Sequence, residues 1–145
     1  GSRLLDETIL NNIVFENSVD QKKLDYAIKV SNSNKFIENY DKKLNYVVGE
    51  NGSNLSGGQA QRIILARAIY KRPKILILDE FTSALDNENE KEIFKSLETL
   101  KNDCIILISS HNPIVSSISD KIFELKRSDD DHKKIILEEV RQQVL

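Results

Sequence analysis

The stretch that decides the fold of this chain is Leu55-Ser56-Gly57-Gly58-Gln59. It is a polar loop with two adjacent glycines, and the apolar run 63–69 after it indicates the start of a buried helix. Ser56 and Gln59 have the spacing of a capping box, with Ser56 as the N-cap. Unpaired N–H groups at a helix start suit an anion, and glycines permit close approach, so the stretch is a candidate phosphate site. Taken alone, the box favours an ordinary capped helix.

Length and composition indicate one globular domain. The chain has 145 residues, a net charge of −2 and 39% hydrophobic residues, so it can bury a core and has no basic field for nucleic acid. Its single cysteine, Cys104, excludes a disulfide within the chain and lies in an apolar run, which predicts a buried thiol. No apolar stretch approaches the length of about 20 residues that spans a bilayer, and no signal peptide is visible, so the chain itself is expected to be soluble.

The first third of the chain predicts a small helical subdomain. Asp6 and Glu7 occupy an N-cap and first turn ahead of apolar residues at helical spacing, and a second helix fits about 20–30. A third short helix carries Phe36, Ile37 and Tyr40 on one side. A loop with two glycines over 47–54 precedes the main helix, which we expect over about 57–71.

The middle of the chain predicts an α/β fold. Pro73 ends the main helix, and the apolar run 75–78 that follows is too short for a helix and does not alternate, as in a strand of a parallel sheet buried on both faces. Asp86 is placed to cap an amphipathic helix, and a second apolar strand covers 104–108. A short helix beginning at Asn112-Pro113 and two strands, near 122–125 and 135–137, complete the chain.

Polar residues follow both buried strands. Asp79 and Glu80 end the first strand, and His111 follows the second. Because ligands of open α/β sheets bind at the carboxyl ends of the strands, the three side chains are candidates for one site. An acid there suits a nucleotide-bound magnesium, and a neighbouring carboxylate can take a proton from an attacking water. Each piece has an ordinary alternative: a strand-to-turn junction for the acids, and helix caps for His111 and Asp86.

Order and spacing together resemble the nucleotide-binding domains of the ATP-binding-cassette (ABC) family. Leu55–Gln59 is similar to the signature loop, Ile75–Glu80 to the Walker B strand, Ser83–Asp86 to the D-loop, and His111 to the switch histidine. The resemblance covers about residues 5–125 and implies a P-loop NTPase (RecA-like) fold: a parallel sheet with flanking helices plus the small helical subdomain. Two further segments resemble exporter-type members: residues 6–13, like the segment after the Q-loop, and residues 48–52, like the X-loop near the transmembrane coupling helices.

The resemblance implies roles for individual residues in a head-to-tail dimer with a second nucleotide-binding domain. The cofactors are ATP and Mg2+. The signature loop faces the γ-phosphate bound by the partner, Asp79 holds the metal, and Glu80 polarises the attacking water. His111 senses the γ-phosphate, and Asp86 crosses the dimer interface. The signature-loop residues are Leu55, Ser56, Gly57, Gly58 and Gln59. Hydrolysis powers export by membrane-spanning domains, which places the domain at the cytoplasmic face of a membrane; no nucleic acid is expected.

The sequence departs from the family pattern because no P-loop, G-x-x-x-x-G-K-[ST], is present. The opening Gly1-Ser2 looks engineered, so we expect a carboxyl-terminal piece of such a domain, cut after the Q-loop and inactive alone. Within it we expect the helical subdomain and X-loop over about 5–54, the signature helix and α/β core over about 55–127, and a terminal strand and tail over about 128–145. Two other functions stay open: a soluble ABC-type ATPase that acts on DNA or ribosomes, and a non-catalytic dimerisation module.

Overall fold

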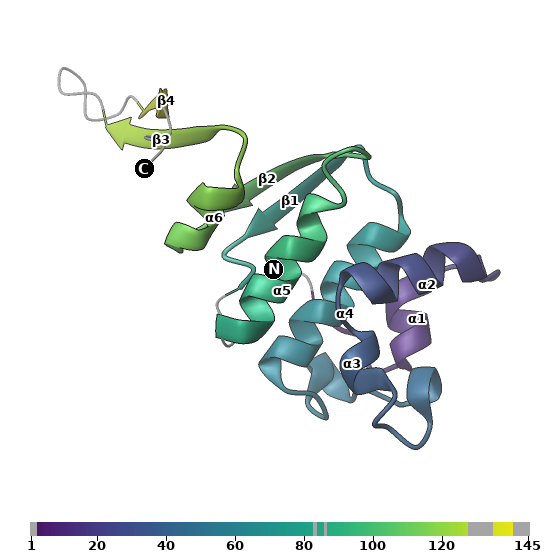
Figure 1. Cartoon of the computed structure of the whole chain (residues 1–145). Coiled ribbons are helices and arrows are strands. Elements are labelled where there is room, and N and C mark those ends of the chain that lie inside the picture. Colours follow the sequence, from purple (N-terminus) through teal and green to yellow (C-terminus); the bar gives the residue numbers. More distant parts are fainter. Residues whose placement is uncertain (1–2, 83, 86, 128–134, 141–145) are drawn as a thin grey trace. The chain divides into compact units, whose positions relative to one another are not determined.

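The structure is a computed structural model of the chain, and it describes residues 3–82, 84–85, 87–127 and 135–140 (Figure 1). The chain divides into two compact units, Gly1–Ser110 and His111–Leu145. The expected signature loop, Asp79 and Glu80 belong to the first unit, whereas His111 belongs to the second.

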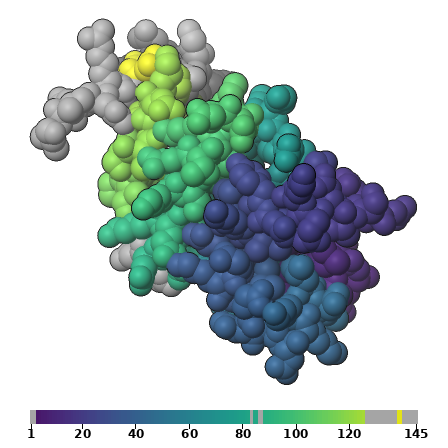
Figure 2. All heavy atoms as spheres, turned by 45° about the vertical axis from the view of Figure 1, so that its right-hand side comes forward, coloured from purple at the N-terminus to yellow at the C-terminus, as the bar shows by residue number. Residues whose placement is uncertain are grey.

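Residues 9–70 of the first unit form three short α-helices and one long α-helix. They are α1 (Ile9–Val14), α2 (Gln21–Val30) and α3 (Asn34–Ile37), and the long helix is α4 (Gly57–Tyr70). Both α1 and α2 lie against α4, and Figure 2 shows the surface that the segments around α2 and α3 form together. Buried apolar side chains from all four helices contribute to the core, including Ile9, Ile13, Leu24, Ala27, Phe36, Ile37, Ile63, Leu65 and Ala66. The expected small helical subdomain and its second helix are therefore confirmed.

Two local expectations for these helices are wrong. The N-cap of α1 is Thr8, whose hydroxyl accepts the N–H of Asn11, so Asp6 and Glu7 precede the helix. The third helix ends at Ile37 and leaves Tyr40 outside. At α1, several short polar side chains precede the helix, and spacing in the sequence does not identify the one that caps it. After Ile37 the backbone changes to shorter-range bonds, from Asn39 N–H to Phe36 O at 3.0 Å and from Tyr40 N–H to Ile37 O at 3.2 Å, which end α3.

A compact loop joins the short helices to α4. It contains two 3-10 turns, η1 (Lys43–Asn45) and η2 (Glu50–Gly52), and is closed by hydrogen bonds from Asn54 N to Val48 O at 3.0 Å and from Leu55 N to Gly52 O at 2.9 Å. Gly49 has a φ of 77°, and a Cβ there would lie 2.4 Å from Ser53 Oγ, so this position requires glycine. These bonds and the positive φ define the path of the chain from the short helices to the start of α4.

The α/β part contains a parallel strand pair, as expected. Strand β1 (Ile75–Asp79) pairs with β2 (Ile105–Ser109) in a register that sets Ile75 opposite Ile105 and Asp79 opposite Ser109. Helix α5 (Asn87–Glu98) connects the strands along the chain, and its apolar stripe is buried, including Ile93, Phe94 and Leu97. Whether Asp86 caps α5 lies outside the described residues.

The expectation that the first strand is buried on both faces is wrong for the described structure. Leu76 and Leu78 are buried, but Ile75 is 54% exposed and Ile77 is 69% exposed. On β2, Ile105 and Leu107 are exposed to a similar degree. Side chains alternate between the faces of a strand, and the described helices cover one face of the pair only. The apolar run 75–78 is therefore typical of a strand that is covered on both faces, but in the described structure only the face with Leu76 and Leu78 is covered.

The second unit contains a short helix and a hairpin. Helix α6 (Pro113–Ile118) begins after Asn112, whose side chain accepts the N–H of Ile114, as the Asn-Pro pair predicts. Strands β3 (Ile122–Arg127) and β4 (Ile135–Val140) are antiparallel, so both expected strands are present and slightly longer than predicted. The end of the tail, 141–145, lies outside the described residues. In the part of the chain that is described, no helix combines the length and apolarity needed to cross a membrane.

Candidate functional site

The start of α4 is a complete capping box. The Ser56 hydroxyl accepts the N–H of Gln59 at 3.2 Å, and the Ser56 N–H donates to Gln59 Oε1 at 2.9 Å. These reciprocal bonds satisfy two donors and fix the backbone from Ser56 to Gln59 as the first turn of a 14-residue helix. The expected capping box is therefore confirmed, and Ser56 lies exposed at the tip of the helix.

The two glycines fill the positions between the capping partners. Neither the Gly57 nor the Gly58 N–H donates a hydrogen bond to a described residue. A Cβ on Gly57 would lie 3.2 Å from Ala84 Cβ, and one on Gly58 would lie 3.1 Å from Leu85 Cδ2. The absence of side chains at Gly57 and Gly58 thus lets residues 84–85 of the same chain approach α4. The sequence alone did not indicate this role of the glycines. Two N–H groups remain at the positive end of a long helix, which suits a phosphate oxygen.

Removing the cap is expected to destabilise the first unit. Ser56→Ala deletes the acceptor of the Gln59 N–H and should lower the free energy of unfolding by about 1 kcal/mol. Urea unfolding followed by circular dichroism measures the change. Ser53→Ala is the matched control, because Ser53 is exposed and its hydroxyl makes no hydrogen bond with the described residues; it should change stability by less than about 0.5 kcal/mol. Equal effects of the two substitutions would contradict a stabilising cap.

The two acids lie where β1 ends. Asp79 is the last residue of β1, opposite Ser109, and alternation places it on the same exposed face as Ile75 and Ile77. Glu80 continues the pairing by one residue, since its N–H donates to the Ser109 carbonyl at 3.0 Å. Its φ of 45° then turns the chain sharply out of the sheet. A left-handed backbone at a non-glycine residue is uncommon and often accompanies a functional position. Both carboxylates are exposed at this end of the strand.

The remaining expected site residues are placed less fully. His111 is the first residue of the second unit and follows the end of β2 at Ser109 by two residues. Asp86 lies outside the described residues, although its neighbours Ala84 and Leu85 contact the signature glycines. Among the described residues, no group of three or more acidic, histidine or cysteine side chains is arranged to hold a metal ion. Asp79 is thus suited to hold Mg2+ only together with other ligands, such as nucleotide oxygens and water.

Two groups of residues around α4 were missed by sequence reasoning. The Tyr40 hydroxyl donates to Gln59 Oε1 at 3.1 Å and so reaches the capping box. Near the C-terminal end of α4, the Arg67 side chain donates to the Asn12 carbonyl at 2.6 Å and to Asn12 Oδ1 at 2.9 Å. The partners in each pair are 19 and 55 residues apart in the chain. The sequence hints at these contacts only because polar side chains stand among apolar ones in the segments 8–14 and 36–46.

Comparison with known proteins identifies the family that this site resembles. The family model described as ABC transporter matches residues 4–83, which include the signature loop and both acids at the end of β1. That range is more than half of the chain.

Curated relatives and a solved structure agree with the family match. An ATP-dependent lipid A-core flippase of Francisella tularensis subsp. tularensis (strain SCHU S4 / Schu 4) is 40% identical over 121 residues, which are 82% of this chain and 20% of the flippase. The flippase of Coxiella burnetii (strain RSA 493 / Nine Mile phase I) is 44% identical over 110 residues, 74% of this chain and 19% of its own length. The chain thus spans about a fifth of the length of the curated relatives that it matches.

The fold comparison gives the same result. The structure of a bacterial Atm1-family ABC exporter with ATP bound matches with a TM-score of 0.78 and 32% sequence identity, over 84% of this chain and 22% of the exporter. The expected fold class, an α/β arrangement of the P-loop NTPase type with a helical subdomain, is confirmed.

Proposed function

Because this chain belongs to the ABC transporter family, we propose that it forms part of the ATP-hydrolysing domain of an exporter. In this proposal ATP lies between two such domains, and the chain supplies the signature loop to the nucleotide that its partner binds. The flippases and the exporter that resemble this chain support export as the direction of transport. In this proposal the membrane-spanning domains bind the transported substrate and determine its specificity, and the ATPase domain lies on the cytoplasmic side of the membrane.

The observation that carries the proposal is the start of α4. A capping box holds Ser56 and Gln59, while the N–H groups of Gly57 and Gly58 donate to no described residue. This arrangement fits the γ-phosphate of ATP, because the donors are aligned before the ligand arrives and the helix end is positive. Leu55, half-buried beside them, is held by its N–H, which donates to the Gly52 carbonyl at 2.9 Å.

In this proposal the two acids at the end of β1 bind the metal ion and activate the attacking water. Asp79 fits a water-mediated ligand of Mg2+, which neutralises phosphate charge when it is bound. Glu80, held next to it by its bond to Ser109, would orient and polarise the attacking water. His111 would donate to the γ-phosphate, and Asp86 would cross to the partner domain. These residues position reactants and stabilise charge, as phosphoryl transfer requires.

Coupling to the membrane domains is assigned to two segments of the first unit. The loop 47–54 is closed by backbone hydrogen bonds of its own, and its first residue pairs with Thr8 in an isolated β-bridge. The segment 6–13 and this loop therefore form one surface, which we propose receives the coupling helices. In this scheme residues 5–54 transmit the signal, residues 55–127 carry the site, and residues 128–145 form the terminal strand and tail.

The experiment that tests the proposal is ATP hydrolysis by the purified transporter whose ATPase domain includes this chain. We expect Mg2+-dependent release of phosphate from ATP in detergent and in proteoliposomes. A preparation that binds ATP at an intact P-loop but releases no phosphate would overturn the proposal. It would favour the non-catalytic dimerisation module instead.

The 145-residue chain alone is expected to bind Mg-ATP weakly, with a Kd above about 1 mM. Its sequence contains no P-loop, whose backbone N–H groups and lysine hold the phosphates in P-loop NTPases. Isothermal titration calorimetry of the chain with Mg-ATP checks this expectation, and phosphate release by the chain should equal the buffer blank. Micromolar binding to the chain alone would contradict it.

A further inference from the structure

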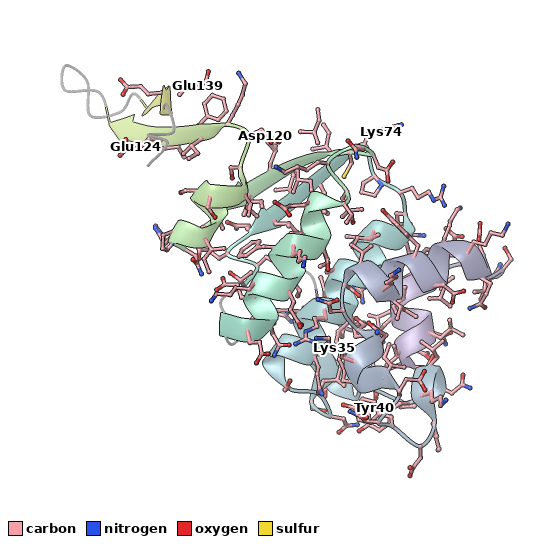
Figure 3. All side chains as sticks on the ribbon, in the orientation of Figure 1. Lys35, Tyr40, Lys74, Asp120, Glu124 and Glu139 are labelled. Carbon is pink, nitrogen blue, oxygen red and sulfur yellow. The ribbon has the colours of Figure 1, made fainter. Side chains whose placement is uncertain are left out.

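Tyr40 forms a hydrogen bond from the helical subdomain to the signature loop. It lies beyond the end of α3 and is half-buried among the loops of that region (Figure 3). Its hydroxyl donates to Gln59 Oε1 at 3.1 Å, and the same oxygen accepts the Ser56 N–H at 2.9 Å. One amide oxygen therefore joins the capping box to the tyrosine.

The direction of the Tyr40 hydroxyl is fixed by neighbouring rings. Tyr46 stacks on Tyr40 with ring centroids 4.0 Å apart and an angle of 16° between the planes. Phe36, which is buried, meets the Tyr40 ring edge-on at 6.3 Å. Aromatic pairs in these geometries contribute more than the area they bury. Tyr40 is thus held on its face and at its edge, which leaves its hydroxyl little freedom to leave Gln59.

Tyr46 ties this ring pair to the loop 47–54. Its carbonyl accepts the N–H of Ile9 at 2.9 Å, and the next residue, Val47, forms the β-bridge to Thr8. Along the chain, the route from Val47 to Ser56 passes through Gly49 and Gly52, both with positive φ. Through the rings, the route from Tyr46 to Gln59 crosses one stacking contact and one hydrogen bond.

We propose that Tyr40 is a positioning residue that fixes the signature loop relative to the loop 47–54 through Gln59 Oε1. A displacement of Tyr46 shifts the stacked ring, and the shift reaches the turn that carries the Gly57 and Gly58 N–H groups. The inference rests on the proposed function, because those N–H groups matter only if they meet a phosphate. Partial burial, followed by the nearby Tyr46, raises the pKa of Tyr40, so its hydroxyl remains a donor at neutral pH.

The test compares Tyr40→Phe with Tyr46→Phe in the transporter that contains this chain. Both variants keep the stacked rings, and each loses one hydroxyl. The Tyr40 hydroxyl bonds Gln59, whereas the Tyr46 hydroxyl makes no hydrogen bond with a described residue. We expect Tyr40→Phe to raise the KM for ATP by about two- to tenfold, the range for one lost neutral hydrogen bond, with a smaller change in kcat. Tyr46→Phe should leave KM within about twofold of the unsubstituted protein.

A purely structural role of Tyr40 gives a different pattern. Loss of folded protein lowers the rate per milligram and leaves KM unchanged, and that result, or an equal KM in both variants, would overturn the inference. Amide hydrogen exchange in the 145-residue chain gives a readout without ATP: the Ser56 N–H should exchange about two- to tenfold faster in Tyr40→Phe than in Tyr46→Phe. Equal exchange in the two variants would also overturn it. If the unsubstituted transporter hydrolyses no ATP, the proposed function is wrong. The exchange rate of the Ser56 N–H then still tests whether the Tyr40 hydroxyl holds the signature loop through Gln59.

Discussion

Glu80→Gln in the transporter that contains this chain is expected to lower the rate of ATP hydrolysis at least about a hundredfold, while ATP binding is retained. General base assistance typically contributes 10²- to 10⁴-fold, and an amide in place of the carboxylate removes it. The substitution keeps the shape of the side chain. It also keeps the main-chain bond from residue 80 to the Ser109 carbonyl, so the fold should be unaffected. The variant should therefore accumulate ATP in a closed dimer.

Two measurements on the Glu80→Gln transporter separate catalysis from binding. Phosphate release gives the rate, and radiolabelled ATP that stays with the protein through gel filtration gives the trapped nucleotide. Glu98→Gln is the matched control, since Glu98 is an exposed residue at the end of α5 and should leave both readings unchanged. A Glu80→Gln variant with unchanged turnover would show that another group assists the water, and would remove Glu80 from the proposed site.

Asn12→Ala is expected to destabilise the first unit by about 3–5 kcal/mol. Asn12 is fully buried, and its side chain accepts the Leu5 N–H and Arg67 while it donates to the carbonyls of Leu5 and Thr8. Alanine leaves these groups without partners inside the protein, and each buried unsatisfied group costs about 1–3 kcal/mol. Against a total stability of about 5–15 kcal/mol for a domain, the loss is large.

The residue before Asn12 provides the control. Asn11 has the same side chain in the same helix, but it is exposed, and among the described residues its side-chain amide donates to Glu7 on the surface. Asn11→Ala should change the free energy of unfolding by less than about 0.5 kcal/mol. Urea unfolding of both variants, followed by circular dichroism, measures the difference. A similar loss in the two variants would mean that the Asn12 network contributes little to stability.

Local interactions explain why much of the fold was predictable. The capping box at Ser56, the Asn-Pro start of α6 at Asn112 and the apolar runs of β1 and β2 each depend on residues within a few positions of one another. Such signals need no knowledge of the rest of the chain. The same holds for the position of Glu80, because an acid at the end of an apolar strand is visible in the sequence.

The sequence proposed the residues of the candidate site, whose roles stay predictions, but it did not indicate their surroundings. The order of the signature loop, the acids at 79–80 and His111 identified the family, which the comparisons confirm. The contact of Gly58 with Leu85, and the bond from Tyr40 to Gln59, join segments whose separation in the chain gives no sign of their approach. Their positions follow from how α3, the loops and α4 pack, and packing depends on the whole set of side chains.

The sequence by itself determined most elements and the family, because periodicity, caps and motif spacing are properties of short segments; the roles of the candidate site residues stay predictions. Only the tertiary structure decided which of two adjacent asparagines is buried, since Asn12 is distinguished from Asn11 by the arrival of Arg67 from α4. It also decided that Ile75 and Ile77 are exposed in the described structure although they belong to a strand of core composition. Whether a side chain is buried depends on which distant segments pack against it, and the type of the residue alone does not determine this.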